Sequence, residues 1–277
     1  MYGREYAKDP GILISSFRDM NKKYKKVAKK KNNNILQKIY LALFGIPEIG
    51  FQLRSLHFDK ALNSKLSNKK FKKILDAGSG IGTYSLMLAK KFPNAKVFGG
   101  DIDNEKINSS IKFAKDLGIE NVEYGYFDVE KSKKNLKFDL IITIDVLEHI
   151  EDFKKVMKNL TSHLAPGGYL YIHTPQPDQN RIFSNMKKWH HEDHSREGYT
   201  PKELVEQVKN LGLKTIYINQ TYGFFGKLAW ELNHMSFEKG FLISGLVFPF
   251  LYPIALLDLT YKNRKGLGTS ILALKSK

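Results

Sequence analysis

Cysteine is absent from this chain of 277 residues. Its absence excludes disulfide bonds, thiolate metal sites and cysteine nucleophiles. Arginine is also scarce, because only six of the 45 basic residues are arginine and the others are lysine. Proteins that recognise base edges, or that bind a phosphate through two parallel hydrogen bonds, favour arginine for this purpose. The lysine excess therefore makes nucleic acid the least favoured partner for a basic surface.

A secretory signal is missing as well. The first residues, MYGREYAKDPGILISSF, contain no basic stretch followed by an unbroken apolar run, which such a signal requires. We therefore expect a cytoplasmic protein. The hydrophobic content of 42% is enough for one sizeable core with accessory elements.

The formal net charge of +17 is concentrated at the amino-terminal end. Residues 1–73 hold 18 Lys and Arg against 5 Asp and Glu, which leaves 27 against 23 for the rest of the chain. Three explanations stay open: a solvated surface that reflects compositional bias, contact with an anionic membrane surface, and binding of nucleic acid.

From about residue 74 onward, short β-branched runs alternate with helical patterns, which predicts βα units around a mostly parallel sheet. We expect strands at 73–78, 96–101, 122–128, 138–145, 167–175, 213–220 and 269–276. We expect helices that begin near Gly82, Asn104, Val146 and Pro201. Thr200 and Glu203 flank Pro201 in the spacing of a capping box.

Accessory segments surround this core. The sequence predicts a basic helical region over 1–66, with helices at 34–44 and 51–62, and a core over 67–221. An insertion over 222–267 separates the last strand, within 268–277, from the core. Residues 240–257 of the insertion carry no charge.

The stretch ILDAGSGIGTYS, residues 74–85, places a glycine-rich turn after a predicted strand. A dinucleotide fingerprint needs its third glycine at the sixth position, but Thr83 stands there and the third glycine is Gly82. Asp76 would also repel a pyrophosphate. S-adenosylmethionine carries no phosphate and presents two cationic groups, so a carboxylate at this turn suits it.

Two more acidic residues end the next strands. Asp101 lies 19 residues after Gly82, about where an acidic side chain reaches the ribose hydroxyls. Asp128 is placed to accept a hydrogen bond from the adenine amino group, with Phe127 and Val129 flanking the ring. Together these residues predict a binding site for S-adenosylmethionine at the carboxyl edge of the sheet.

The motifs LDAGSGIG, GGDID, YFDVE, FDLIITIDVLEHI and LAPGGYLYIHTP resemble those of class I S-adenosylmethionine-dependent methyltransferases. The resemblance covers residues 70–220 and is strongest to the ubiquinone-biosynthesis O-methyltransferases. It implies a Rossmann-like α/β fold with seven strands, the last one antiparallel. We expect a cofactor site without metal. Ser79 departs from the cysteine that many relatives have at this position. The expected cofactor residues are Asp76, Gly78, Ser79, Gly80, Gly82, Asp101, Ile102, Phe127, Asp128, Val129, Asp145 and Val146.

A hydroxyl group is the expected methyl acceptor. Enzymes that methylate exocyclic or amide nitrogens usually carry Asn or Asp, two prolines and an aromatic residue after the fourth strand. Here that place reads Asp145, Val146, Leu147 and Glu148. Methylation of cytosine C5 through a covalent adduct would need the absent cysteine.

Removing a hydroxyl proton calls for a base with a pKa near neutrality, which histidine provides. The stretch WHHEDHSREGYT, residues 189–200, gathers several histidines at the predicted edge. His194 is the first candidate for the base and His191 the second. A metal site and a polar hydrogen-bonded loop are the alternatives for this stretch. His173 can face the pocket, and His149 is expected to support the cofactor loop.

We do not expect the apolar insertion to be a simple membrane crossing, because both flanking strands are expected to belong to one sheet and because Pro249 and Pro253 interrupt the insertion. Pocket lining, an element at a membrane interface and ordinary core remain as alternatives. We therefore expect an O-methyltransferase for a small lipophilic or amphipathic hydroxyl compound, cytoplasmic and able to associate peripherally with a membrane. The alternatives are an RNA methyltransferase that uses the basic segment and a cofactor-binding partner that activates another methyltransferase without being an enzyme itself. The sequence does not indicate an oligomeric state.

Overall fold

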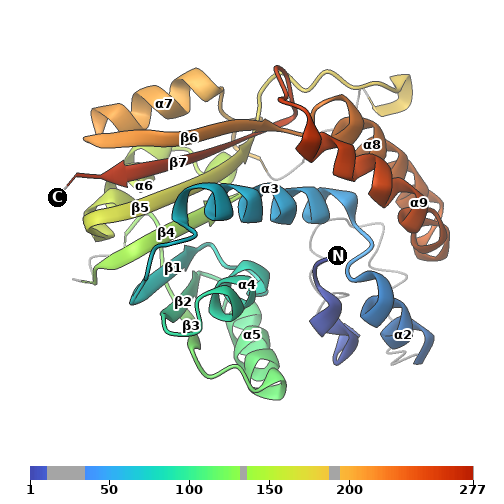
Figure 1. The fold of residues 1–277 in the computed structure, drawn as a ribbon, viewed down its shortest axis with the longest axis horizontal. Helices are drawn as coiled ribbons and strands as arrows, with labels where there is room; N and C mark the ends of the chain where they lie inside the picture. Colours follow the sequence, from blue (N-terminus) through green and yellow to red (C-terminus); the bar gives the residue numbers. More distant parts are fainter. Residues whose placement is uncertain (11–34, 132–135, 187–193, 277) are drawn as a thin grey trace.

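The computed structural model describes residues 1–10, 35–131, 136–186 and 194–276. A seven-stranded sheet forms the centre of the molecule (Figure 1), in the order β3-β2-β1-β4-β5-β7-β6. The strands are β1 (Lys73–Ala77), β2 (Lys96–Asp101), β3 (Val122–Tyr126), β4 (Phe138–Ile144), β5 (Leu164–Pro175), β6 (Leu213–Thr221) and β7 (Gly268–Lys275). β7 is antiparallel to β5 and β6, and the other neighbouring pairs are parallel. The predicted sheet and its antiparallel last strand are confirmed.

Helices cover both faces of the sheet. The core helices are α4 (Thr83–Lys91), α5 (Asn104–Leu117), α6 (Phe153–His163) and α7 (Pro201–Asn210). Strand residues alternate between two apolar clusters, as the period of a strand requires. Ile74 and Ile142 pack with α4 and α5, whereas Leu75 and Ile141 pack with α6 and α7. The result is an α/β/α sandwich with its core on either side of the sheet.

The local signals for helix ends were reliable in α7 and failed after β4. Thr200 and Glu203 form the predicted capping box. A helix follows β4 as predicted, but its predicted start near Val146 is wrong. Leu147–His149 forms only a 3₁₀ turn, and α6 begins at Phe153. Asp145 has a φ of 52°, a left-handed conformation that turns the chain aside before a helix can form.

The accessory elements lie beside the carboxyl edge of the sheet, except for one helix over Ile49–Leu66, which packs across a face of the sheet with Phe58 against Tyr171. They are the 3₁₀ turns η1 (Arg4–Ala7) and η4 (Ser184–Met186), with helices α2 (Ile35–Phe44), α3 (Ile49–Leu66), α8 (Phe224–Lys239) and α9 (Phe241–Thr260). The second amino-terminal helix starts earlier than predicted, because the carboxylate of Glu48 caps it by accepting from the backbone N–H of Gly50 and Phe51.

The insertion forms α8 and α9, which pack side by side and against α3. Thr221 and Gly268 are paired at the strand ends where the insertion leaves and returns. Its position at the carboxyl edge of the sheet is thus as expected. In the described part of the chain, one helical segment, Leu242–Thr260, has the length and the apolar composition of a membrane span. A third of its most apolar part, 33%, is buried inside the protein.

Candidate active site

The glycine turn after β1 folds tightly against its neighbours. Gly78 has a φ of 82°, and a Cβ there would come within 2.4 Å of Val146. The backbone N–H groups of Gly78 and Ser79 both donate to the carbonyl of Gly100, at 2.8 and 3.0 Å. Gly80 also has a positive φ, but a Cβ there would meet nothing within 4 Å. One side of the turn therefore faces open space.

Ser79 and Asp76 are polar groups buried at this turn. The hydroxyl of Ser79 makes no hydrogen bond to the described residues. The carboxyl group of Asp76 accepts a hydrogen bond of 2.6 Å from the Ser85 hydroxyl. Burial raises the pKa of Asp76 to about 7, and the nearby Asp101 carboxylate contributes to the rise. A cation bound beside Asp76 would favour its charged form.

Asp101 and Asp128 lie at the ends of neighbouring strands, as the sequence predicts. The Asp101 carboxylate accepts hydrogen bonds from the backbone N–H of Gly80, at 2.7 Å, and of Asp103, at 3.0 Å. Asp128 accepts from the backbone of Glu130 at 2.8 Å. Both carboxylates retain acceptor capacity beyond these bonds. Ile102 follows Asp101 and is 63% exposed, an apolar surface beside the acidic group.

Phe127 and Val129 are less accessible than the sequence suggested. Phe127 is buried, with its ring 6.5 Å from that of Phe98 and 5.5 Å from that of His163. Val129 is also buried in the same apolar cluster. The expectation that they flank an adenine ring stays a prediction.

A partly buried ionic network extends from the end of β4 to the accessory helices. Asp145 Oδ1 lies 2.6 Å from Nδ1 of His173, and Oδ2 lies 3.1 Å from Nε of Arg54 on α3. The second ring nitrogen of His173 is 3.0 Å from the Thr221 hydroxyl. This network holds Asp145 in its left-handed conformation. Such strain is found disproportionately at functional sites.

A second strained residue, Tyr222, begins the insertion with a φ of 58°. Its hydroxyl donates to the carbonyl of Gly50 at 2.6 Å, and its backbone N–H donates to Asp258 at 3.0 Å. Asp258 also lies 2.8 Å from Nε2 of His57. Burial lowers the pKa of His57, against the effect of the Asp258 hydrogen bond. These contacts fix α9 to α3 and to the end of β6.

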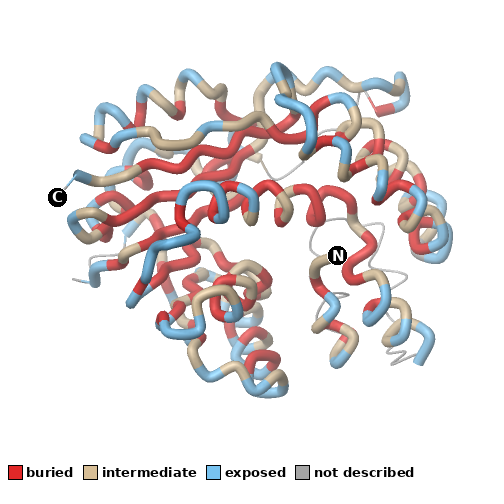
Figure 2. Tube along the Cα trace, viewed as in Figure 1, coloured by how far each residue is buried: buried red, intermediate tan, exposed pale blue. Residues whose placement is uncertain are grey.

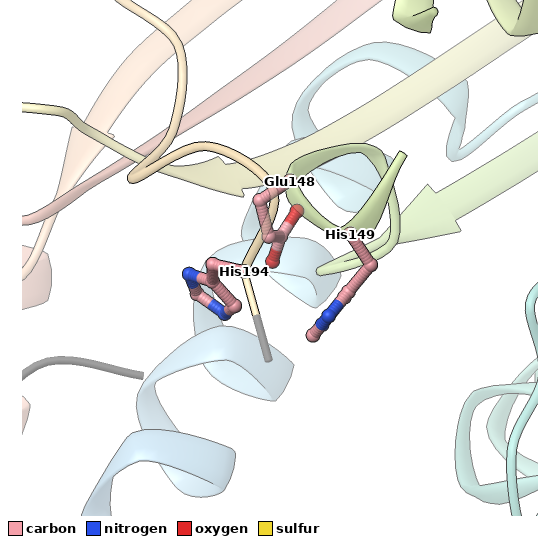
Figure 3. A group of neighbouring side chains, drawn as sticks. All are labelled: Glu148, His149 and His194. Carbon is pink, nitrogen blue, oxygen red and sulfur yellow. The ribbon is translucent and has the colours of Figure 1, made fainter. Parts of the chain in front are cut away.

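The 3₁₀ turn after β4 brings Glu148 and His149 beside His194. Their possible ligand atoms lie within 4.8 Å of one another. The two rings pack edge to face with their centroids 4.7 Å apart, and the Glu148 carboxyl group lies beside both of them (Figure 3). Oε2 of Glu148 accepts from Thr174 at 3.3 Å, and Oε1 makes no hydrogen bond to the described residues. Burial and the nearby Asp145 carboxylate raise the pKa of Glu148 well above its usual range.

The histidines that the sequence singled out have different surroundings in the structure. His194 is half-buried beside Glu148, and His173 contacts Asp145 in the core. His191 lies outside the described residues. Sequence reasoning missed Arg54 and Glu148. Glu148 lies in the motif FDLIITIDVLEHI, next to His149. This acidic residue beside a histidine was the only local sign that Glu148 belongs to the site.

Comparisons with known proteins give the family. Residues 53–218 match the family described as "Methyltransferase domain", which is more than half of the chain. The ubiquinone biosynthesis O-methyltransferase of Coxiella burnetii is 34% identical over 160 residues, 54% of this chain and 66% of that protein. A probable (S)-tetrahydroprotoberberine N-methyltransferase 2 of Papaver bracteatum is 30% identical over 114 residues, 41% of this chain and 32% of that protein. The chain thus spans 32% and 66% of the length of these two relatives.

Solved structures share the fold at low sequence identity. A putative sarcosine dimethylglycine methyltransferase from Galdieria sulphuraria aligns with a TM-score of 0.56 and 18% identity, over 87% of this chain and 96% of that one. The [4+2]-cyclase SpnF aligns with a TM-score of 0.54 and 15% identity, over 79% of this chain and 80% of that one. At such identities the alignments support the fold alone. The family match and the sheet order agree, and the chain belongs to the methyltransferase domain family, among the class I S-adenosylmethionine-dependent methyltransferases.

Proposed function

We propose that this chain transfers a methyl group from S-adenosylmethionine to a hydroxyl group of a small lipophilic or amphipathic compound. The observation that carries the proposal is the row of acidic side chains at the carboxyl ends of β1, β2 and β3, beside a turn with one open side. The 34% identity to a protein named as an O-methyltransferase supports oxygen as the acceptor atom. A relative named as an N-methyltransferase keeps nitrogen as the competing acceptor.

The cofactor site is proposed to use the predicted residues. A polar ligand that lies along the turn fits the open side of Gly80 and the Ser79 hydroxyl, which has no hydrogen-bond partner in the described part of the chain. Asp101 has the acceptor capacity for vicinal hydroxyls, and exposed Ile102 can cover one face of an aromatic ring. Asp76 fits an ammonium group, because a nearby cation offsets the cost of charging a buried carboxyl. Gly78, Gly82, Val146 and Asp145 shape the turn and its surroundings.

S-adenosylmethionine, when bound, supplies the electrophilic methyl group. The protein must then align the acceptor oxygen and remove its proton. His194 is the proposed base, because an imidazole is half-charged near neutral pH. The buried carboxyl group of Glu148 lies next to this ring and can orient it. Removal of the proton raises the electron density on the oxygen that attacks the methyl group.

A divalent cation at Glu148, His149 and His194 is a second candidate for activating the hydroxyl. Two imidazoles and a carboxylate form a common ligand set for divalent metals, and their atoms are close enough to approach one ion after small rotations. Oε1 of the buried Glu148 accepts no hydrogen bond from the residues that the structure describes, which favours this candidate. A cation there would activate the acceptor hydroxyl by lowering its pKa. A free imidazole would then not be needed as the base.

The division into a basic region over 1–66, a cofactor-binding core over 67–221, an apolar cap over 222–267 and a last strand is part of the proposal. In this proposal the cap lines a lipophilic pocket at the carboxyl edge. The protein is proposed to be cytoplasmic and to work at a membrane surface, from which a lipophilic acceptor can reach the site. RNA methylation and a role as an inactive partner remain the competing functions.

Formation of S-adenosylhomocysteine tests the proposal directly. The full chain is incubated with S-adenosylmethionine and a panel of phenols, quinols, long-chain alcohols, amines and transfer RNA, and methylated products are identified by mass spectrometry. Products with a new methyl ether on a lipophilic hydroxyl compound support it. Methylation confined to amines or RNA, or cofactor binding without turnover on any acceptor class, contradicts it.

A further inference from the structure

Exposed hydrophobic side chains are concentrated on two helices. Among the described residues, seventeen large hydrophobic side chains are exposed, and nine of them belong to α2 and α9. These nine form what we call the apolar surface: Ile35, Leu36, Ile39 and Leu43 of α2, with Leu242, Ile243, Leu246, Phe250 and Leu257 of α9. A concentration of this kind on a soluble surface marks an interaction site.

The spacing places these side chains on one side of each helix. Leu242, Leu246 and Phe250 of α9 follow one another at intervals of four residues, and they are 82%, 73% and 77% exposed. Ile35, Ile39 and Leu43 of α2 follow the same spacing. Residues four apart lie on one helix face. Each helix therefore presents an apolar stripe to its surroundings rather than scattered single residues.

The two helices are joined to each other. The hydroxyl of Tyr40 on α2 donates to the carbonyl of Gly245 on α9 at 2.7 Å. Phe44, at the end of α2, packs against the cluster that contains Phe248 and Leu251 of α9. Both helices lie at the end of the molecule away from the carboxyl terminus (Figure 1), and Figure 2 shows exposed positions along them. The stripes thus belong to one region of the surface.

The opposite side of α9 packs against the rest of the protein. Phe248 is fully buried, and the buried Ser244 hydroxyl lies 3.2 Å from Nδ2 of Asn233 on α8. Near its end, Asp258 contacts His57 and the backbone of Tyr222. A helix held along one side and apolar on the other fits an orientation in the plane of a membrane interface.

The charge of the chain indicates which partner fits this surface. Residues 11–34, which lead directly into α2 in the sequence, contain eight Lys and Arg and a single acidic residue, Asp19. Basic residues next to an apolar helix face are typical of segments that bind anionic lipids. A net charge of +17 also opposes the pairing of two copies of this chain.

We infer that the apolar surface of α2 and α9 docks the protein onto an anionic lipid membrane, with both helices parallel to the membrane plane. The side chains of Leu246 and Phe250 enter the boundary between headgroups and acyl chains. The strong positive net charge of the chain attracts it to the anionic headgroups. This inference concerns docking alone and does not depend on which acceptor is methylated.

Vesicle flotation of the full chain tests the inference. Vesicles of phosphatidylcholine alone are compared with vesicles of phosphatidylcholine and phosphatidylglycerol in equal parts. We expect at least about tenfold stronger binding to the anionic vesicles, weakened by added salt, since each basic residue near such a surface adds to the attraction. Leu246→Asp is expected to weaken this binding at least about tenfold, because a leucine that enters the lipid is replaced by a charge.

The matched control is Ile111→Asp, which places the same charge at an exposed isoleucine of α5. It is expected to leave vesicle binding unchanged, and both variants must keep the wild-type melting temperature. Leu246→Trp adds a local readout, because its fluorescence shifts to the blue when it enters lipid. Equal binding by Leu246→Asp and Ile111→Asp, or no blue shift on binding, overturns the inference.

Other partners give distinct results. A dimer in sedimentation analysis that Leu246→Asp dissociates, without vesicle binding by the wild type, assigns the surface to a second copy and overturns the inference. Tight, salt-sensitive binding to transfer RNA without vesicle binding assigns the charge to nucleic acid and also overturns it. Loss of turnover with intact vesicle binding bears on the proposed function and leaves the docking inference supported.

Discussion

His173 contacts Asp145 through a hydrogen bond of 2.6 Å, and Asp145 adopts a left-handed backbone conformation with a φ of 52°. His173 lies on β5 and Asp145 follows β4, so the contact joins the ends of two neighbouring strands. Arg54 binds the other carboxylate oxygen of Asp145 at 3.1 Å. The carboxylate thereby stabilises a strained turn directly before Glu148.

Asp145→Ala is expected to lower the free energy of unfolding more than Asp145→Asn does, by about 1 kcal/mol. Both changes remove the ionic contacts, but alanine disfavours a left-handed conformation that asparagine tolerates. Denaturation in urea measures the difference. Equal losses of unfolding free energy in the two variants would show that the left-handed backbone conformation at this position makes no difference to stability.

Asp101→Ala is expected to abolish most of the stabilisation by S-adenosylhomocysteine. A ligand that binds only the folded protein adds about 2.7 kcal/mol at a hundredfold excess over its dissociation constant. Thermal unfolding with and without ligand measures this effect. Asp116→Ala, an exposed carboxylate on α5, is the control and should keep the full shift. Stabilisation of the wild type by NAD but not by S-adenosylhomocysteine would contradict the cofactor assignment.

Asp76 is expected to make stability and ligand binding depend on pH. Its pKa rises from the ordinary 3.8 to about 7 in the folded protein, so the folded state binds the proton more tightly than the unfolded chain. The resulting stabilisation is complete below about pH 4 and is lost as the pH rises through 7. Relative to Asp76→Asn, the wild type should lose up to about 4 kcal/mol between pH 4 and pH 8.

The same residue gives the opposite trend for the cofactor. Affinity for S-adenosylhomocysteine should rise as the pH increases through 7, because only the carboxylate attracts the ammonium group. Asp76→Asn should remove this dependence. Calorimetric titration at several pH values measures it, and a flat profile in the wild type would show that Asp76 does not face the ligand's charge.

His194→Ala is expected to lower turnover by about 10²- to 10⁴-fold while affinity for the cofactor stays nearly unchanged, because loss of a general base acts on the transition state. His149→Ala should be milder if His194 acts alone as base, and a chelator should then have no effect. Equal losses in His149→Ala, His194→Ala and Glu148→Gln, with inhibition by a chelator that zinc or magnesium reverses, would establish the metal-assisted alternative. His191→Ala is the comparison for the second candidate base.

The parts of the fold that depend on neighbouring residues could be predicted from the sequence. The strand at 96–101 has the predicted bounds, and the capping box of Thr200 and Glu203 is present. These features follow from side-chain periodicity and from hydrogen bonds within one turn of helix. Asp101 and Asp128 lie at strand ends for the same reason.

The parts that depend on distant partners could not be predicted. The turn at Asp145 is stabilised by His173 and Arg54, which lie on other elements. Nothing next to Arg54 in the sequence indicates that its guanidinium reaches the end of β4. The burial of Glu148 likewise arises from the packing of several segments and not from a local pattern.

Asp258 is expected to hold the insertion in place. Its carboxylate, which is buried, lies 2.8 Å from Nε2 of His57 and accepts hydrogen bonds from the backbone N–H of Tyr222 and Gly226. Asp258→Ala should cost about 3–5 kcal/mol of unfolding free energy, because it leaves three buried donors without their acceptor. The double variant with His57→Ala should lose less than the sum of the single losses, since the two side chains share one interaction. Additive losses in urea denaturation would show that the 2.8 Å contact contributes no coupling between α3 and α9.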